Sequence, residues 1–162
     1  MPRRADIQLA PDEIAQFIDD ARLVVASTHG GHGFPHVVPL WFLREGVDIV
    51  AWSYAKSQKV HNLRRDPRAT LMFESGDSYT ELRGVVLECD VDVVDDPAEI
   101  SRAGKALAIR YRTGVESAYR GDGAAGVVDE QAKRRCVLRF RPVRTISWDH
   151  SKMVLPPVPE SS

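Results

Sequence analysis

The sequence lacks any long apolar run, and its 162 residues contain only two cysteines. No stretch approaches the roughly 20 apolar residues that a membrane-spanning helix needs, so we expect no membrane association. The first six residues lead into no apolar segment of the kind found in a secretory leader, and we expect a cytoplasmic protein. Cys89 and Cys136 lack metal-ligand spacing and stand in apolar runs, which indicates reduced thiols in the core.

The chain also lacks an excess of either charge. Lys and Arg total 22 and Asp and Glu total 23, which gives a net charge of -1 and a pI near 6.5. Nucleic-acid-binding domains are usually strongly basic, so we expect no nucleic-acid partner. A chain of this length can bury roughly 70% of its unfolded surface as one domain. We predict a single domain over residues 1–153 and a flexible tail over residues 154–162.

Metal and hydrolase motifs are lacking as well. His29, His32 and His36 surround a glycine turn, but no cysteine or carboxylate nearby completes a set of metal ligands. We therefore predict no metal site. Asp149 and His150 are adjacent in a predicted strand and would point to opposite faces, which excludes a catalytic triad there.

Apolar periodicity and turn residues predict a mainly β chain with helices. Helices are expected over residues 11–21, 57–66, 97–112 and 127–133. Strands are expected over residues 23–28, 35–44, 48–54, 69–74, 80–94, 135–141 and 143–149. Residues 113–126 hold four glycines and are expected to form a long loop. Strands in hairpin succession predict an α+β fold built on an antiparallel barrel, with peripheral helices, and not a parallel wound sheet.

Residues 56–68 are the most informative segment of the chain. Ser57 is a favourable N-cap, and Val60 and Leu63 have the three-residue spacing of a short amphipathic helix. Pro67 cannot continue such a helix and ends it. The segment is therefore predicted to be a short helix that follows directly on a strand.

The start of this predicted helix carries cations where a helix should repel them. Lys59 falls at about the second helical position, beside the positive end of the helix dipole, and Lys56 lies just upstream. This arrangement costs a few tenths of a kcal/mol unless an anion offsets it. Free amides and lysines at a helix start favour a phosphate site. A solvated basic face is the alternative interpretation, and it suits His61 and Arg65, which project away from the apolar stripe.

The predicted strand over residues 35–44 is apolar on both faces over residues 37–43, which is typical of a strand covered twice. One face can fill the barrel, and the other can meet a second subunit or a flat ligand. Pro39 donates no ladder hydrogen bond and so indicates a sheet edge or a bulge. Trp52 lies on the neighbouring strand, which leads into the basic helix. The sequence thus predicts aromatic surface, an interrupted strand and an anion site close together.

Four segments together resemble the split-barrel flavin-binding superfamily typified by pyridoxamine phosphate oxidase. The resemblance covers about residues 6–153 and implies an antiparallel split β-barrel of the FMN-binding type. Within that superfamily, the chain is most similar to the B group of oxidoreductases that depend on the deazaflavin coenzyme F420. The segments that carry the resemblance are residues 33–42, 56–68, 76–85 and 144–152.

The resemblance implies a homodimer with two cofactors bound in clefts between the subunits. The cofactor phosphate would be held by Lys56, Ser57 and Lys59. The strand of His36, Val37, Val38 and Pro39 would lie along the ring system. Trp52 would form another wall, and Tyr79 and Trp148 would reach the site from the partner subunit.

One departure from the family pattern bears on the choice of cofactor. Members that hold FMN tightly usually have an arginine between the serine and lysine of the helix start, where this chain has Gln58. Because arginine clamps a phosphate with a planar fork, its absence weakens the case for FMN. Coenzyme F420 is the expected cofactor, and FMN is the alternative.

The resemblance implies a reductase that transfers a hydride to a small conjugated or apolar substrate. A protein that stores F420 without specific turnover is the alternative function. His36 is the candidate proton donor, since the ordinary pKa of histidine near 6.5 suits proton transfer. Packing against the cleft wall is the other interpretation of His36, and the sequence leaves both open.

Overall fold

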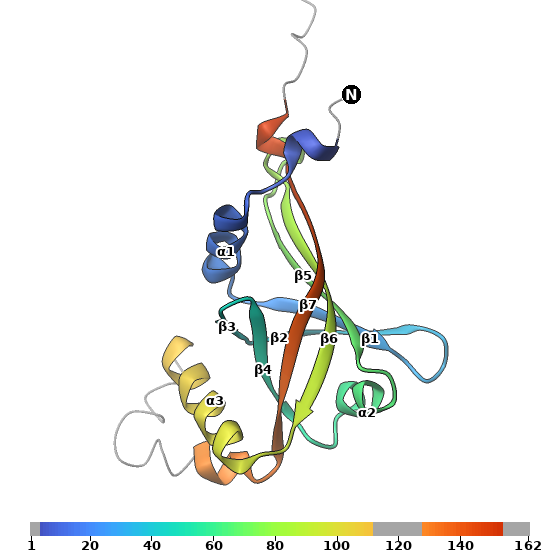
Figure 1. The fold of residues 1–162 in the computed structure, drawn as a ribbon, viewed down its shortest axis with the longest axis vertical. Helices are drawn as coiled ribbons and strands as arrows, with labels where there is room; N and C mark the ends of the chain where they lie inside the picture. The colour runs from blue at the N-terminus through green and yellow to red at the C-terminus, as the bar shows by residue number, and fades with distance from the viewer. Residues whose placement is uncertain (1–3, 112–127, 154–162) are drawn as a thin grey trace, which may run out of the picture.

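The computed structural model of the protein describes residues 4–111 and 128–153 (Figure 1). The loop predicted over residues 113–126 and the tail predicted over residues 154–162 lie outside these residues. Over the described ranges, no helix combines the length and the apolar character needed to cross a membrane.

The strands form one seven-stranded antiparallel sheet with the order β2-β1-β5-β6-β7-β4-β3, which curls into a half-barrel (Figure 1). This confirms the predicted antiparallel split barrel with peripheral helices. Both β2 and β3 are edge strands, and β6 and β7 lie centrally. The strands are β1 (Val24–His29), β2 (Pro35–Leu40), β3 (Leu43–Glu45), β4 (Asp48–Tyr54), β5 (Arg68–Ser75), β6 (Arg83–Val94) and β7 (Arg135–Asp149).

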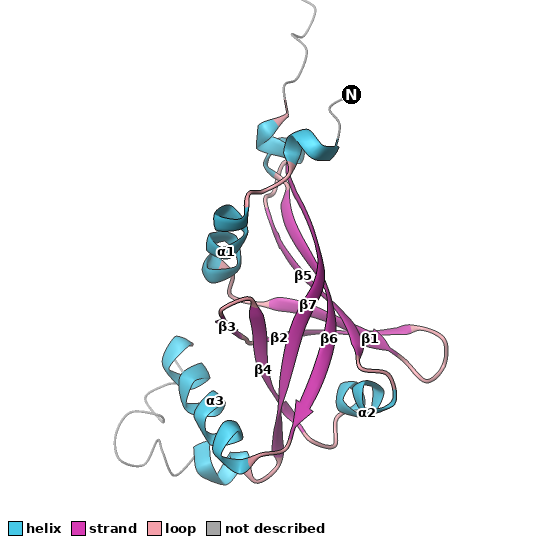
Figure 2. Cartoon of the chain, viewed as in Figure 1, coloured by secondary structure: helices cyan, strands magenta, loops and turns pink. Residues whose placement is uncertain are grey.

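The helices lie around the sheet (Figure 2). Helix α2 contacts β1 and β6, whereas α3 contacts β3, β4 and β7. The two helices lie on opposite sides of the lower ends of β6 and β7 in Figure 1. The described helical segments are α1 (Pro11–Asp20), α2 (Gln58–Arg65), α3 (Pro97–Arg110), residues 128–132, and the 3₁₀ helices η1 (Arg4–Ile7), η2 (Tyr79–Glu81) and η4 (His150–Lys152).

The prediction of a single strand over residues 35–44 is wrong. This segment forms two strands, β2 and β3, which are separated by Trp41 and Phe42. The Tyr111 hydroxyl accepts a hydrogen bond from Phe42 N at 2.9 Å and donates one to Phe42 O at 3.1 Å. The Tyr111 ring stacks on Trp41, with the ring centroids 4.6 Å apart. A buried side chain from the end of α3 thus takes the backbone groups that would otherwise continue the ladder.

The two strands predicted over residues 135–141 and 143–149 are also wrong, since β7 is continuous. The pairing register of β6 and β7 shifts between Glu88 and Cys89, which lie opposite Arg144 and Pro142. Proline lacks the N–H that the ladder needs, so the strand accommodates Pro142 with a bulge. The predicted start of β6 at residue 80 is wrong as well, because residues 79–81 form η2.

The core lies on the concave face of the sheet. Phe42, Phe73 and Phe140 are fully buried there, and α2 closes this core with Val60 and Leu63. A second, smaller cluster lies under α3 on the other side of β4 and β7. It contains Val50, Ile100, Ala103 and Val137.

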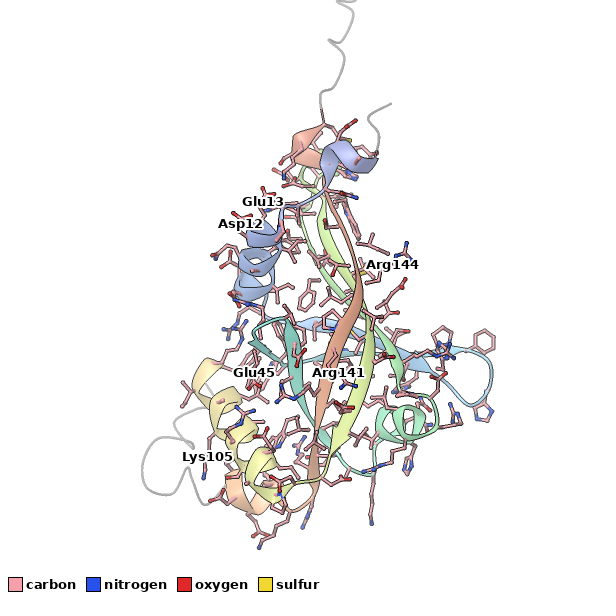
Figure 3. The ribbon with its side chains drawn as sticks, viewed as in Figure 1. Asp12, Glu13, Glu45, Lys105, Arg141 and Arg144 are labelled. Atoms are coloured by element: carbon pink, nitrogen blue, oxygen red, sulfur yellow. The ribbon has the colours of Figure 1, made fainter. Side chains whose placement is uncertain are left out.

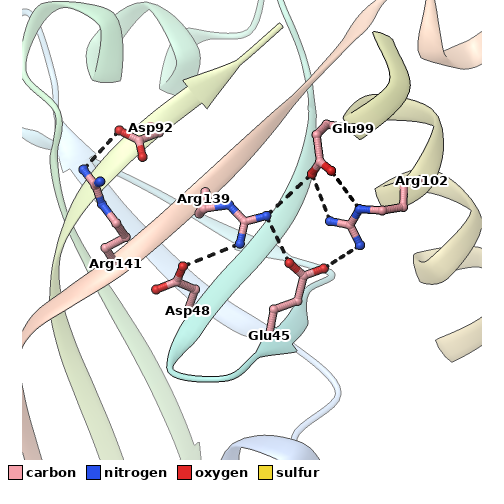
Figure 4. A network of polar contacts seen from close by, with 7 residues as sticks. All are labelled: Glu45, Asp48, Asp92, Glu99, Arg102, Arg139 and Arg141. Atoms are coloured by element: carbon pink, nitrogen blue, oxygen red, sulfur yellow. Dashed lines mark hydrogen bonds and ion pairs between the residues drawn. The ribbon is translucent and has the colours of Figure 1, made fainter. Parts of the chain in front are cut away.

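A network of charged side chains fastens α3 to the sheet (Figure 4). Arg139 on β7 lies 3.0 Å from Glu45, 3.5 Å from Asp48 and 3.6 Å from Glu99. Arg102 on α3 bridges two of the same carboxylates, at 2.7 Å from Glu45 and 3.0 Å from Glu99. Ion-pair networks of this kind contribute more than isolated surface pairs, because each charge has several partners.

Candidate anion and cofactor site

The start of α2 carries an incompletely satisfied set of hydrogen-bond donors. Ser57 is the N-cap residue, as predicted, but its side chain makes no capping hydrogen bond. Its hydroxyl lies instead 3.1 Å from the Ser53 hydroxyl and 3.5 Å from the Lys59 ammonium. In the first turn the Val60 amide already donates to Ser57 O at 3.1 Å, which leaves the amides of Gln58 and Lys59 to bind an acceptor placed beside Ser57.

Lys59 is half-buried at the second position of α2. Burial lowers the pKa of its ammonium group, and the nearby charge of Arg135 acts in the same direction. A charged lysine is thus held in an unfavourable place, next to the positive end of the helix dipole. A bound anion would restore the balance of charge at this point.

Like Lys59, the cations around it form no ion pair with an acidic side chain in the described part of the chain. Most Lys and Arg side chains of the described ranges form ion pairs with carboxylates, as Arg64 does with Asp95. In those ranges, four cations have no ion pair with a carboxylate. They lie where β4 ends, β7 begins and α2 starts. The backbone brings them together, since Ala55 N donates to Arg134 O at 3.0 Å and Tyr54 pairs with Arg135. The four are Lys56, Lys59, Arg134 and Arg135.

Arg135 is held by aromatic rings. Its guanidinium lies 3.6 Å from the centroid of Tyr54 and 5.0 Å from that of Trp52. Its Nε is buried, and no hydrogen-bond partner for it is found in the described part of the chain. Stacking on aromatic faces fixes the guanidinium in place and leaves its edge free for an acceptor.

A buried hydrogen bond from Asn62 connects α2 to β1, and exposed Gln58 extends it within α2. The Gln58 amide donates to the Asn62 carbonyl at 2.9 Å, and the Asn62 amide donates to the Thr28 hydroxyl at 3.1 Å. Asn62 is 0% exposed and Thr28 is 1% exposed. Thr28 pairs with His36 on β2, so this series of hydrogen bonds ends beside the edge strand. The Gln58 amide is directed along the helix toward Asn62 and is not free at the helix start.

The exposed row of the sheet is apolar across five strands. In the antiparallel register, Pro39 pairs with Val25, Val25 with Met72, Met72 with Val86, and Val86 with Ile146. Val25 and Met72 are 36% and 37% exposed, and Val37 on β2 is 55% exposed. Cross-strand neighbours on one face contact one another, so these side chains form a continuous apolar surface, here called the outer face.

The comparisons with known proteins agree with this architecture. The sequence profile of pyridoxamine 5'-phosphate oxidase matches residues 10–149. The chain belongs to the pyridoxamine 5'-phosphate oxidase family. A search of curated proteins found no match.

Among solved structures, the conserved hypothetical protein Rv2991 of Mycobacterium tuberculosis is 35% identical, with a TM-score of 0.83; the match covers 100% of this chain and 98% of that one. An F420 reductase is 20% identical, with a TM-score of 0.62, and 85% and 95% of the chains are covered. The heme storage protein HutZ of Vibrio cholerae is 12% identical, with a TM-score of 0.64, and 85% and 94% of the chains are covered. The last two likenesses show the fold alone, and one fold can serve different ligands.

Within this family fold, the structure brings some of the predicted site residues together. Lys56, Ser57 and Lys59 lie at the start of α2, and His36 is half-buried opposite Thr28. Along β2, Val38 faces the core side with His36, whereas Val37 and Pro39 lie on the outer face. In the single chain only the core side of β2 is covered, because Val37 and Pro39 are exposed, so the predicted cover on the outer face stays a prediction.

Trp52 lies beside the cation cluster, because the Arg135 guanidinium is 5.0 Å from its ring centroid. Trp52 also packs under α3, where a Cβ added at Gly104 would lie 2.7 Å from its ring. The remaining predicted residues lie elsewhere in the single chain. Trp148 lies directly over Gly84, its pairing partner on β6, and Tyr79 is 68% exposed and tilts against His150. These last residues are at the far end of the long strands, roughly 25 Å from α2, because the eight residues of β5 separate the two ends.

Three residues of the site were not found from the sequence. Arg134 and Arg135 are far from α2 along the chain, and only the basic run at residues 133–135 hinted at them. Asn62 is polar, and its complete burial depends on partners from another element. Strand pairing brings Arg134 and Arg135 to the start of α2, and the docking of α2 on β1 buries Asn62 against Thr28.

Proposed function

We propose that the protein is an oxidoreductase that binds coenzyme F420 as a homodimer and reduces a small conjugated or apolar substrate. The observation that carries this proposal is the half-buried Lys59 at the start of α2, among cations that form no ion pair with a carboxylate in the described ranges. A phosphate group offsets such a cluster better than a neutral ligand does.

The residues present fit the phosphate of a flavin-type cofactor. Lys59 and Lys56 would supply charge, and the Ser57 hydroxyl and the first amides of α2 would supply hydrogen-bond donors. When bound, reduced F420 supplies a hydride to an electrophilic carbon of the substrate. Gln58 donates to Asn62 and so adds no second fork to the phosphate, which supports F420 over FMN.

The edge strand β2 would carry the ring system. The free edge of the strand offers backbone groups, and Pro39 leaves one position without a donor. The protein must hold the substrate within about 3 to 3.5 Å of the reacting carbon of the cofactor. His36 is half-buried close to this strand and is the side chain to test as a proton donor to the product.

The outer face supports a homodimer. An apolar surface that crosses five strands is costly to expose, and a second copy of the chain would cover it. Arg144 and Glu88 form an ion pair at 3.2 Å beside this surface. Figure 3 shows that Arg144 points away from helix α1, which carries Asp12 and Glu13. A polar border around an apolar centre is typical of protein interfaces. Tyr79 and Trp148 would then approach the partner's cofactor.

A titration of the purified protein tests this proposal. Added F420 should quench tryptophan emission at lower concentration than FMN does. The reverse order would replace F420 by FMN, and no binding of either would reject the proposal. The reduced F420 complex should then be oxidised by a set of conjugated enones and quinones. Tight binding without turnover of any of them would indicate a storage protein.

A further inference from the structure

The hydrogen-bonded pair Asn62–Thr28 is unusual because it is polar and almost fully enclosed, and exposed Gln58 extends it to the start of α2. Asn62 is 0% exposed between α2 and β1, at a position where a leucine would pack against the same core. Burying an amide is unfavourable unless its hydrogen bonds are made, and both groups of the Asn62 amide have a partner here. Buried polar networks of this kind specify one arrangement of the elements that they join.

The elements joined are the two halves of the proposed site. Gln58 is the first residue of α2, beside Ser57 and Lys59, where the cofactor phosphate would bind. Thr28 is the direct partner of His36 on β2, where the cofactor ring would lie. The Gln58–Asn62 bond lies within α2, and the Asn62–Thr28 bond at 3.1 Å is the one that joins α2 to β1 and so restrains the spacing between the two halves.

We propose that Asn62 is a positioning residue that sets the distance between the anion site at the start of α2 and the edge strand β2. It acts through Thr28 and touches neither the phosphate nor the ring. A ligand that reaches both halves depends on this spacing, whereas a ligand that occupies only the anion site does not. This inference rests on the proposed function, because it assumes one cofactor that contacts both places.

The test compares two ligands of different reach. Inorganic phosphate reports on the anion site alone and is followed by NMR through the Lys59 amide shift. Coenzyme F420 reports on both halves and is followed by tryptophan emission. In N62L and T28V, F420 affinity should fall about tenfold or more, while phosphate affinity stays within about twofold. T28S keeps the hydroxyl and should retain the F420 affinity of the original protein.

The double variant N62L/T28V separates a shared link from two independent effects. Both substitutions break the same hydrogen bond. The loss of F420 affinity in the double variant should therefore be no larger than the loss in whichever single variant binds F420 more weakly. Retention of F420 affinity in N62L and T28V, or an equal loss for phosphate and F420, would overturn the positioning role. If N62L fails to fold, the comparison of T28V with T28S decides alone.

Failure of the proposed function has a different signature. An original protein that binds phosphate but neither F420 nor FMN would reject the proposed function, and the positioning role with it. In the other case, the original protein binds F420, Lys59→Ala binds it weakly, and T28V binds it as the original protein does. That result would leave the proposed function standing and would overturn only the role of Asn62.

Discussion

At the scale of single residues, Lys59 has the most unfavourable surroundings of the described cations at the start of α2. Its ammonium is half-buried, lies near a second cation and sits at the positive end of a helix dipole. The serine that should cap the helix makes no capping bond and turns its hydroxyl toward this ammonium. Local rules that are broken together at one place indicate a ligand site.

Lys59→Ala should weaken F420 and phosphate binding tenfold or more, because a charge-assisted contact is worth about 1.5 to 3 kcal/mol. The fold should persist, since only a half-buried polar group is lost. His61→Ala is the matched control: His61 is an exposed residue of the same helix, and its loss should leave both affinities unchanged. Equal affinities in Lys59→Ala and the original protein would reject the anion site.

The lowered pKa of Lys59 predicts a pH dependence of binding. An anion favours the charged lysine, so affinity should be full at neutral pH and should fall as pH rises through the lowered pKa, before the ordinary lysine value of about 10.4 is reached. Lys59→Arg should hold its affinity over the same range, because guanidinium does not titrate there. A phosphate titration from pH 7 to pH 10 measures this, and parallel curves for the two proteins would contradict it.

The two thiols should be inert in the folded protein. Burial raises the pKa of Cys89 to about 12 and that of Cys136 to about 11. Since the thiolate is the reactive form, alkylation at pH 8 should be slow in the folded chain and fast after unfolding in denaturant. Mass spectrometry after a timed reaction with iodoacetamide checks this, and rapid labelling of either cysteine in the folded state would show that the core around it opens.

At the scale of elements, the hydrophobic pattern predicts most helices and strands, because the residues concerned face one of the two apolar clusters. The helix over residues 57–66 and its Lys59 follow from local signals alone: an N-cap serine, a three-residue stripe and a closing proline. The division of residues 35–44 into β2 and β3 could not be predicted, because it depends on Tyr111, which lies 69 residues further along the chain. Asn62 was missed for the same reason, since its partner Thr28 is 34 residues away.

The charge network under α3 allows a prediction at this scale. Arg139→Leu leaves Glu45, Asp48 and Glu99 close together without their common cation, and should destabilise the fold by about 1 to 3 kcal/mol. Arg141→Ala on the same strand removes only an exposed pair with Asp92 and should cost less than about 1 kcal/mol. Urea unfolding of the two variants measures the difference, and equal stabilities would show that the network does not hold α3.

At the scale of the whole molecule, two features of the sheet are suited to contact with a second copy of the chain. The outer face is apolar across five strands, and the long strands carry Tyr79 and Trp148 to the end of the sheet away from α2. Both features suit a dimer in which each chain completes the cofactor cleft of the other. A cofactor site of this kind depends on subunit contact for its walls and on α2 for its charge.

Val37→Glu combined with Met72→Glu should produce a monomer, because two buried carboxylates would oppose the interface. Sedimentation at micromolar concentration should give a dimer for the original protein and a monomer for the double variant. The monomer should keep phosphate binding at α2 but lose most of its F420 affinity. A monomeric original protein, or full F420 affinity in the monomeric variant, would contradict an interface cleft.

The most direct measurement of the central claim is a crystal structure of the protein with F420 bound. The account predicts that the phosphate of the cofactor lies at the first turn of α2, within hydrogen-bond distance of the Lys59 ammonium and the Ser57 hydroxyl. Clear density for the cofactor elsewhere, with the start of α2 left without an anion, would contradict it.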